Sequence, residues 1–156
     1  MKNLVFTFCL FTTAQIFAQN AMIGAIDSKN YSTVQKLTVS GIDVNQPYDI
    51  EDQKMTALSY ASLRGDVEMV NLLIKKGALV TPIIDSRDAL MYAAKGGNKE
   101  IIEILLSKGA KVMNESKEGK TARDYAANAG HTDIAVLLES EMQNIVNQAK
   151  AKRLKK

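Results

Sequence analysis

The stretch that decides the fold is TALSYASLRG at residues 56–65. It returns as DALMYAAKGG at residues 88–97 and as TARDYAANAG at residues 121–130. The glycines that end the three copies are 32 and then 33 residues apart. A fixed period of this size predicts an array of stacked repeat units rather than one closed core. Such arrays usually display a long surface to a partner.

Each copy carries the signals of a short helix. Thr56, Asp88 and Thr121 are candidate N-caps because their side-chain oxygens can accept from backbone N–H groups two or three residues on. The glycine at the end of each copy can take the left-handed conformation that terminates a helix. A second helix is predicted over residues 67–74 and again over residues 100–106, where apolar residues recur at helical spacing. Each unit is therefore expected to be a helix-turn-helix pair, and residues 79–87 and 111–120 are expected to form loops or short hairpins between units.

The chain resembles ankyrin repeat proteins, whose units read Thr-Pro-Leu-His, paired alanines, Gly-His, an aliphatic helix and Gly-Ala-Asp-Val-Asn. The segment GIDVN at residues 41–45 is close to the last of these motifs, and His131 completes a Gly-His pair. The resemblance implies an all-α ankyrin-repeat solenoid of about four helix-turn-helix repeats with an extended C-terminal capping helix. The repeats are expected at about residues 20–50, 51–84, 85–117 and 118–146.

The sequence departs from the family pattern at the motif proline and the motif histidine. Alanine replaces the proline in all three copies, and Ser59, Met91 and Asp124 replace the histidine. In the family this histidine ties neighbouring loops by hydrogen bonds, so its loss predicts less rigid loops. The last helix departs as well, because its apolar stripe continues to about residue 146. Its extra turns are expected to cover the open end of the stack.

The first residues have the pattern of a secretory signal peptide. Lys2 precedes the apolar run of residues 4–11, and Ala18 is a small residue suited to cleavage. Cleavage near Ala18 would leave a repeat domain over residues 19–149 and a basic tail over residues 150–156. The protein is then periplasmic or secreted; a retained amphipathic or buried helix is the other interpretation. The single cysteine lies in the segment to be removed, so the mature chain would have no thiol for a disulfide or a thiolate metal site.

Charge is distributed unevenly along the chain. Residues 19–149 contain fourteen basic and seventeen acidic side chains, a net charge of −3, whereas residues 150–156 contain five basic ones. A solvated helix end is one interpretation of this tail, and binding to an anionic membrane is another, at about 1 kcal/mol per basic residue at best. Nucleic acid is not expected as a partner, because no aromatic residues are interspersed among the basic ones.

No constellation of residues predicts catalysis, a cofactor or a metal. His131 is the only histidine, and one imidazole without a thiol or a second ligand makes neither a metal site nor an activated nucleophile. Glu68, Glu100 and Glu103 fall on the expected solvent face of the second helices. Phosphate-binding loops and nucleophile elbows are missing from the sequence. We therefore expect a protein that is not an enzyme.

Candidate contact residues lie in two regions. One region is the loops, where residues 46–53 form the most individual segment and residues 82–84 place aliphatic side chains at a turn. The other is the concave face, reached by residues just before the helix-ending glycines. The predicted partner-binding residues are Tyr48, Ile50, Asp52, Leu63, Arg64, Ile83, Lys95 and Asn128. Two alternatives stay open. Ile50 and Ile83 either contact a partner or tuck under the next repeat. The column of tyrosines at positions 60, 92 and 125 either packs between the helices or forms a binding stripe.

These observations predict an exported, non-enzymatic module that captures a protein partner and is monomeric when free. A periplasmic inhibitor or immunity protein that neutralises a toxin is one alternative. A membrane-surface adaptor that works through the basic tail is another. The partner itself cannot be read from the sequence, because repeat scaffolds of one family differ in what they bind.

Overall fold

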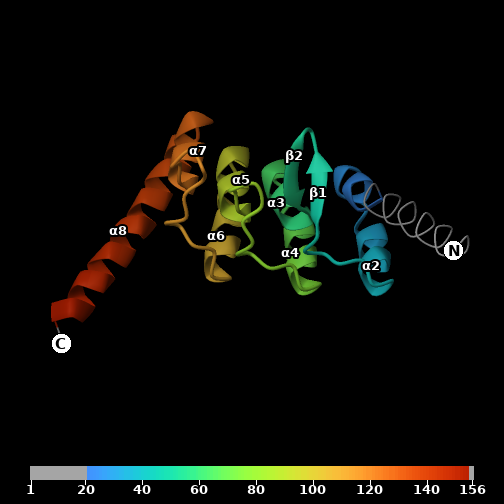
Figure 1. Ribbon diagram of the computed structural model, residues 1–156, viewed down its shortest axis with the longest axis horizontal. Helices are drawn as coiled ribbons and strands as arrows, with labels where there is room; N and C mark the ends of the chain where they lie inside the picture. Colours follow the sequence, from blue (N-terminus) through green and yellow to red (C-terminus); the bar gives the residue numbers. More distant parts are fainter. Residues whose placement is uncertain (1–20, 155–156) are drawn as a thin grey trace, which may run out of the picture.

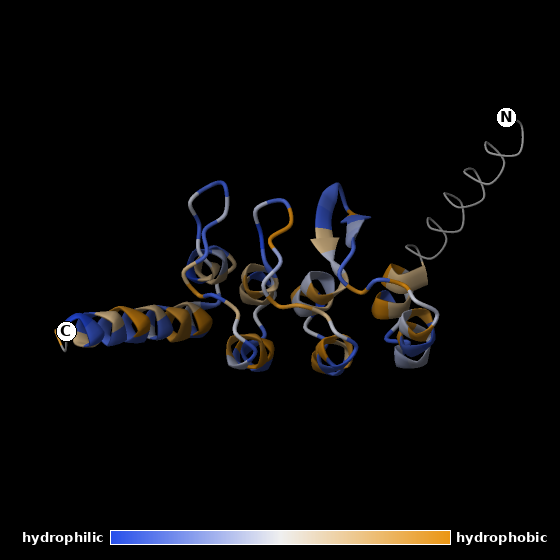
Figure 2. Cartoon of the chain, turned by 60° about the horizontal axis from the view of Figure 1, so that its bottom comes forward, coloured by the Kyte–Doolittle hydropathy of each residue, from blue (hydrophilic) through white to orange (hydrophobic). Residues whose placement is uncertain are grey.

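The computed structural model describes residues 21–154 and shows helix pairs stacked side by side in a row (Figure 1). Seen nearly end-on, the helices form two layers, and the connecting loops rise together on one side of the stack (Figure 2). Residues 21–27 are helical and precede the named elements. These are α2 (Tyr31–Val39), β1 (Pro47–Ile50), β2 (Gln53–Thr56), α3 (Ala57–Arg64), α4 (Val67–Lys75), α5 (Ala89–Gly96), α6 (Lys99–Ser107), α7 (Ala122–Asn128) and α8 (Thr132–Leu154).

The predicted N-caps start the inner helices α3, α5 and α7. The Thr56 hydroxyl accepts from the Ser59 N–H at 3.1 Å, and the Asp88 carboxylate accepts from the Met91 N–H at 3.0 Å. At α7 the bonding is reversed, because the Asp124 carboxylate accepts from both the N–H and the hydroxyl of Thr121, each at 2.9 Å. The three helix starts predicted from the repeat are confirmed.

The helix-ending glycines adopt the conformation that the sequence predicted. Gly65, Gly97 and Gly130 have φ of 71°, 78° and 84°, in the left-handed region. In the first unit Lys29 has φ of 52° at the turn between the helix over residues 21–27 and α2. The first unit therefore has lysine at the turn where the other units have glycine, so the glycine pattern does not reveal it.

The core is a continuous layer between the stacked units. Helix α3 packs on α5, and α5 packs on α7, so that most of α3 and of α5 is enclosed, whereas α7 buries only Ala122 and Ala126. The alanines at positions 61, 93 and 126 are fully buried, because small side chains let the helices approach closely. The outer helices bury one face, with Leu73 of α4 and Leu105 of α6 fully enclosed. The all-α repeat solenoid predicted from the sequence is confirmed.

Residues 46–53 are not the loop that the sequence predicted. Strands β1 and β2 form an antiparallel hairpin in which Ile50 pairs with Gln53, and Glu51 and Asp52 make the two-residue turn. These two residues have φ of 48° and 61°, as a type I′ turn requires. The hairpin arises because residues 47–50 alternate between exposed and buried side chains and so form a half-buried strand.

Hydrogen bonds tie neighbouring loops even though the motif histidine is missing. The Asn45 amide donates to the Gly77 carbonyl at 3.1 Å and accepts from the Leu79 N–H at 2.8 Å. The Asp85 carboxylate accepts from the Lys54 N–H at 3.0 Å, so the loop that contains Asp85 is hydrogen-bonded to strand β2. These hydrogen bonds connect neighbouring loops in place of the missing histidine, which the sequence analysis did not predict.

Asn45→Ala should lower the free energy of unfolding by about 1–2 kcal/mol, because it removes two hydrogen bonds between units. The loss can be measured by urea denaturation followed by circular dichroism. Asn71→Ala is the control: Asn71 is exposed on α4, and alanine is a better helix former there. Equal losses for the two variants would show that the Asn45 bonds contribute nothing.

Helix α8 is longer than the stack that it closes. Only Ile134, Ala135 and Leu138 of its 23 residues are buried, and all residues from 147 to 154 are exposed. Its far half extends away from the other helices (Figure 1). The extended C-terminal helix is confirmed, but the expectation that its extra turns cover the open end is wrong for these residues, since the helix axis leads them past the stack.

Candidate functional site

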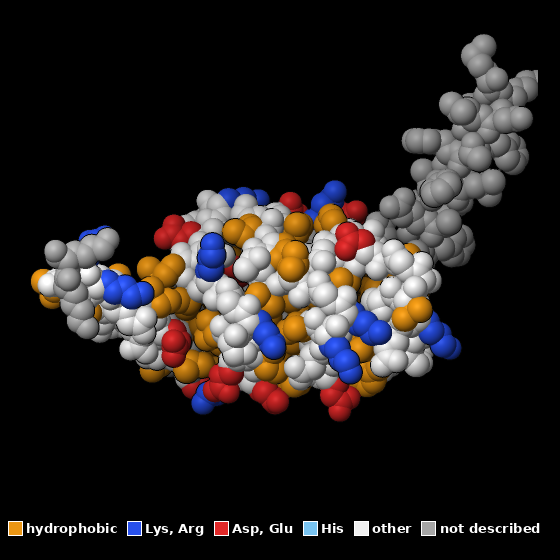
Figure 3. Space-filling view, turned by 90° about the horizontal axis from the view of Figure 1, so that it is seen from below, with side chains coloured by type: hydrophobic (Ala, Val, Ile, Leu, Met, Phe, Trp, Pro, Cys, Tyr) orange, Lys and Arg blue, Asp and Glu red, His pale blue; other side chains and the backbone are white. Residues whose placement is uncertain are grey.

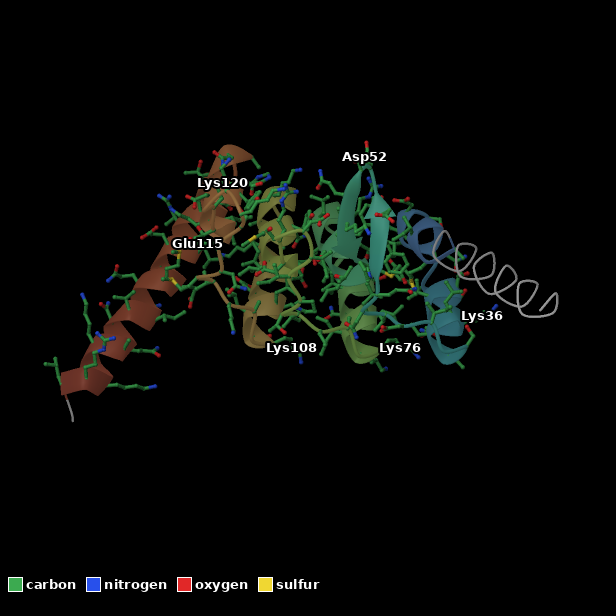
Figure 4. All side chains as sticks on the ribbon, viewed as in Figure 1. Lys36, Asp52, Lys76, Lys108, Glu115 and Lys120 are labelled. Carbon is green, nitrogen blue, oxygen red and sulfur yellow. The ribbon has the colours of Figure 1, made fainter. Side chains whose placement is uncertain are left out.

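Charged residues lie at two opposite edges of the stack, with Asp52 at one edge and Lys36, Lys76 and Lys108 at the other (Figure 4). One edge, here called the tip edge, consists of the loop tips at residues 51–52, 85–86 and 117–118. Asp52 lies at its extreme point (Figure 4). The other, here called the lysine edge, contains Lys36, Lys76 and Lys108 at or near the ends of α2, α4 and α6. The charged residues of the lysine edge lie at helix ends, whereas those of the tip edge lie in the connecting loops.

The lysine edge follows from helix chemistry. Lysine near a helix C-terminus interacts favourably with the negative end of the helix dipole. Figure 3 views the molecule from this edge and shows basic, acidic and apolar side chains interspersed. The lysines therefore have a structural reason for their positions, and no single charge dominates this face.

The tip edge carries an acidic group of side chains. A shallow hollow at the two hairpin tips is lined by Asp49, Glu51, Asp52, Lys54 and Asp85. The only basic member, Lys54, has its Nζ 3.9 Å from Asp49 Oδ1. Four carboxylates against one ammonium give this hollow a negative charge. Asp52, a predicted contact residue, is exposed here.

Tyr48 and Ile50 do not present the exposed side chains that the sequence predicted. Tyr48 is 1% exposed and Ile50 is 7% exposed, because both lie on the inward face of β1. The Tyr48 hydroxyl accepts from the Gln46 amide at 3.0 Å, and burial raises the pKa of Tyr48. The signal for this burial was present in the sequence, since Tyr48 and Ile50 alternate with polar neighbours as in a half-buried strand.

Ile83 is exposed, unlike Ile50. Half of its surface is accessible, and the apolar segment of the middle loop is visible in Figure 2. The loop closes through a bridge between Ile84 and Arg87, with Asp85 and Ser86 at positive φ in its turn. The alternative that Ile83 tucks under the adjacent repeat is wrong.

The structure brings the predicted concave-face residues together in one row. Leu63, Arg64, Lys95 and Asn128 lie at the C-terminal ends of α3, α5 and α7, which are consecutive neighbours in the stack. Leu63 is half-buried and the other three are exposed. We call these residues the helix-end row.

Asp27 extends this row into the first unit, and the sequence prediction missed it. Its carboxylate accepts from the Tyr60 hydroxyl at 2.6 Å and lies 3.7 Å from Arg64 Nε. A signal for it existed: the 36-residue step from Gly41 to Gly77 leads from Leu63 back to Asp27.

The tyrosine column belongs to the scaffold. Tyr60 and Tyr92 are buried, and Tyr125 is half-buried beneath Arg87, whose guanidinium carbon lies 5.8 Å from the ring centroid. Burial, with the hydrogen bond to Asp27, raises the pKa of Tyr60 to about 12. Arg87 also donates to Gln53 Oε1 at 2.8 Å and so links three successive units. The packing interpretation of the column is confirmed.

The structure also places the other residues that were weighed for chemistry. The His131 ring packs on Gly97, where any added Cβ would meet it. Glu68, Glu100 and Glu103 are exposed, as predicted. Across residues 21–154, no group of three or more histidine, cysteine, aspartate or glutamate side chains is arranged to hold a metal ion. No helix in the same range combines the length and the apolar character needed to cross a membrane. The predicted signal peptide lies outside the described residues.

Comparison with known families agrees with this geometry. The family model for ankyrin repeats (3 copies) matches residues 21–114 and, in an overlapping match, residues 79–149. No curated protein matches the chain significantly.

Proposed function

The chain belongs to the ankyrin repeat family, and on this premise we propose that it captures a specific protein through the tip edge and the helix-end row. Ankyrin repeats are generally protein–protein interaction modules and are typically non-enzymatic. The partner would lie along the stack and contact several units at once.

One observation carries this proposal: the units repeat where they are buried and differ where they are exposed. Alanine recurs, fully buried, at positions 61, 93 and 126. Two residues further along each helix the chain has leucine at 63, lysine at 95 and asparagine at 128. A scaffold requires the first set to be alike, whereas unlike residues at equivalent accessible positions give each unit a different contact surface, as recognition of one specific partner needs.

The acidic hollow favours a partner with a basic contact surface. Opposite charges across an interface speed association and select against wrong partners. The apolar run at residues 4–11 and the small residue Ala18 favour export to the periplasm or beyond. A more specialised form of the same proposal is an inhibitor or immunity protein that neutralises a basic toxin after export.

The test compares binding variants on the two edges. Asp52→Ala combined with Arg64→Ala should weaken binding to the captured partner by about tenfold or more, if these residues lie in the contact. Both side chains are exposed, so the fold should not change, and isothermal titration calorimetry can measure the affinity. Tyr48 is unsuitable for this purpose, because its substitution would disturb the core.

Lys36→Ala combined with Lys108→Ala, on the lysine edge, is the matched control and should leave the affinity unchanged. If the lysine-edge variant lost affinity and the other variant kept it, the partner would bind the opposite edge and the proposed surface would be wrong.

A further inference from the structure

The lysine edge carries exposed apolar side chains as well as lysines. Val39 is the last residue of α2, Leu79 follows the end of α4 and Met113 follows the end of α6. Between 48% and 79% of the surface of each is accessible. The helix dipole accounts for a lysine at a helix end, but it gives no reason for an exposed apolar side chain beside it. Exposed apolar side chains in a row indicate a contact surface.

Neighbouring units bring these apolar side chains and the lysines together. A hollow between the ends of α2 and α4 is lined by Lys36, Val39 and Lys76, together with the polar residues Ser32, Gln35 and Ser40. Val39 therefore lies beside lysines from two successive units. The Asn45 amide accepts from the Leu79 N–H at 2.8 Å, so the backbone that carries Leu79 is also fixed to the preceding unit.

The end of α8 points to the same side of the molecule as the lysine edge (Figures 1 and 4). It has the same composition, because Lys150, Lys152 and Arg153 precede Leu154, which is 89% exposed. Figure 3 views this side and shows basic side chains along the stack and on α8. The side therefore combines basic and apolar residues along its whole length.

The helix ends themselves are strongly basic, although the whole face in Figure 3 has mixed charge. Eight basic side chains and one acidic side chain, that of Asp43, lie in residues 36–43, 75–79, 108–113 and 150–154. The acidic residues Glu68 and Glu100 lie in the first turns of α4 and α6, at the opposite ends of these helices. Glu103 lies 3.8 Å from Lys99 in an ion pair. A negatively charged surface is the complement of such an edge.

We propose that the lysine edge and the end of α8 together bind the surface of an anionic lipid bilayer. A basic residue near such a surface strengthens binding by up to about fivefold, and apolar side chains among the basic ones enter the interface. The apolar side chains here project outward, as entry into a soft interface requires, whereas a protein partner would need packed pockets for its anchoring residues. A flat surface also meets the ends of α2, α4, α6 and α8 at once.

This contact is independent of the partner capture proposed above. The tip edge lies opposite the lysine edge, so a molecule bound to the bilayer would hold the tip edge towards solvent (Figure 4). The same chain would then place a captured protein at the membrane surface.

Co-sedimentation of the full chain with lipid vesicles tests this contact. The readout is the ratio of two partition coefficients, one for phosphatidylcholine vesicles with about 30% phosphatidylglycerol and one for phosphatidylcholine alone. This ratio cancels the affinity that the apolar residues 4–11 contribute to both kinds of vesicle. The wild-type ratio should be about tenfold or more and should fall towards unity between about 0.1 M and about 0.5 M salt. A ratio near unity at low salt overturns the proposal.

Two triple variants with the same change in net charge separate the edge from the charge of the whole chain. Three exposed lysines of the edge are removed in Lys36→Gln, Lys108→Gln, Lys111→Gln, which should lower the ratio by about tenfold or more. Three exposed lysines elsewhere are removed in Lys95→Gln, Lys117→Gln, Lys120→Gln, which should change the ratio by no more than about twofold. Equal losses would mean that net charge alone governs binding, and they overturn the proposal.

A pair of apolar substitutions tests whether the bound surface is lipid. Val39→Asn combined with Leu79→Asn should weaken binding to the anionic vesicles several-fold, because both side chains enter the interface. Val136→Asn combined with Ile83→Asn alters comparably exposed apolar residues away from the edge, and it should leave binding unchanged. If the first pair bound as the wild type does while the edge lysines were still required, the edge would recognise negative charge alone. An acidic protein also supplies such charge, so this result overturns the assignment to a membrane.

Discussion

Leu105→Ala should lower the free energy of unfolding by about 2–5 kcal/mol, the range for removing a large apolar side chain from a packed core. Leu105 is 0% exposed and lies on the face of α6 that also buries Ile101 and Ile102. Neighbouring units enclose this face, so the structure cannot close the cavity without moving a whole helix pair. Urea denaturation monitored by circular dichroism gives the loss directly.

The comparison for this prediction is Leu79→Ala. Leu79 is 58% exposed in the loop after α4, so the same truncation should change the free energy of unfolding by no more than about 0.5 kcal/mol. A loss near zero at Leu105 would mean that α6 does not pack as described. Similar losses at both positions would point to an effect on the unfolded chain.

The helices could be predicted because their signals are local. Thr56 and Asp88 bond to N–H groups three residues away, and Gly65 and Gly97 act through their own φ. The buried faces of α4 and α6 follow from helical spacing within nine residues. Because the repeat presents each signal more than once, the stacked fold could be predicted from the pattern.

The hairpin and its ties could not be predicted in the same way. The Asp85–Lys54 and Arg87–Gln53 hydrogen bonds join residues 31 and 34 positions apart, and their formation depends on how neighbouring units are placed. The turn at Glu51 and Asp52 lacks the glycine or asparagine that usually marks a type I′ turn. Of the contact residues predicted in this segment, Asp52 is therefore exposed, whereas Tyr48 and Ile50 are buried.

The direction of α8 is a third case. Its apolar stripe runs on from Leu138 to Ile145 without a break, so the sequence alone predicts one continuous buried face. The structure divides that face at the end of α7, because a helix as short as α7 can cover only the first turns of α8. What the sequence presented as a cap is, in its far half, an exposed surface.

Gly96→Ala should lower the free energy of unfolding by about 1–3 kcal/mol, although alanine is the better helix former. Gly96 is the last residue of α5, and a Cβ there would lie 2.5 Å from the carbonyl oxygen of Leu63 in α3. The atoms that a Cβ would meet belong to the backbone of Leu63 and cannot rotate away. Helices α3 and α5 would therefore have to move apart, although α5 is also packed on α7. The equivalent positions in the other copies hold Arg64 and Ala129, so the repeat gave no sign of this requirement.

Gly24→Ala separates this steric cause from helix propensity. Gly24 is also helical, and a Cβ there would have no neighbour within 4 Å. The substitution should therefore raise the free energy of unfolding by about 0.5–1 kcal/mol, the usual gain when alanine replaces glycine inside a helix. Opposite signs for one substitution in two helices would show that the close approach of α3 and α5 makes Gly96 necessary. If Gly96→Ala also stabilised the protein, the two inner helices would have to lie further apart than the structure places them.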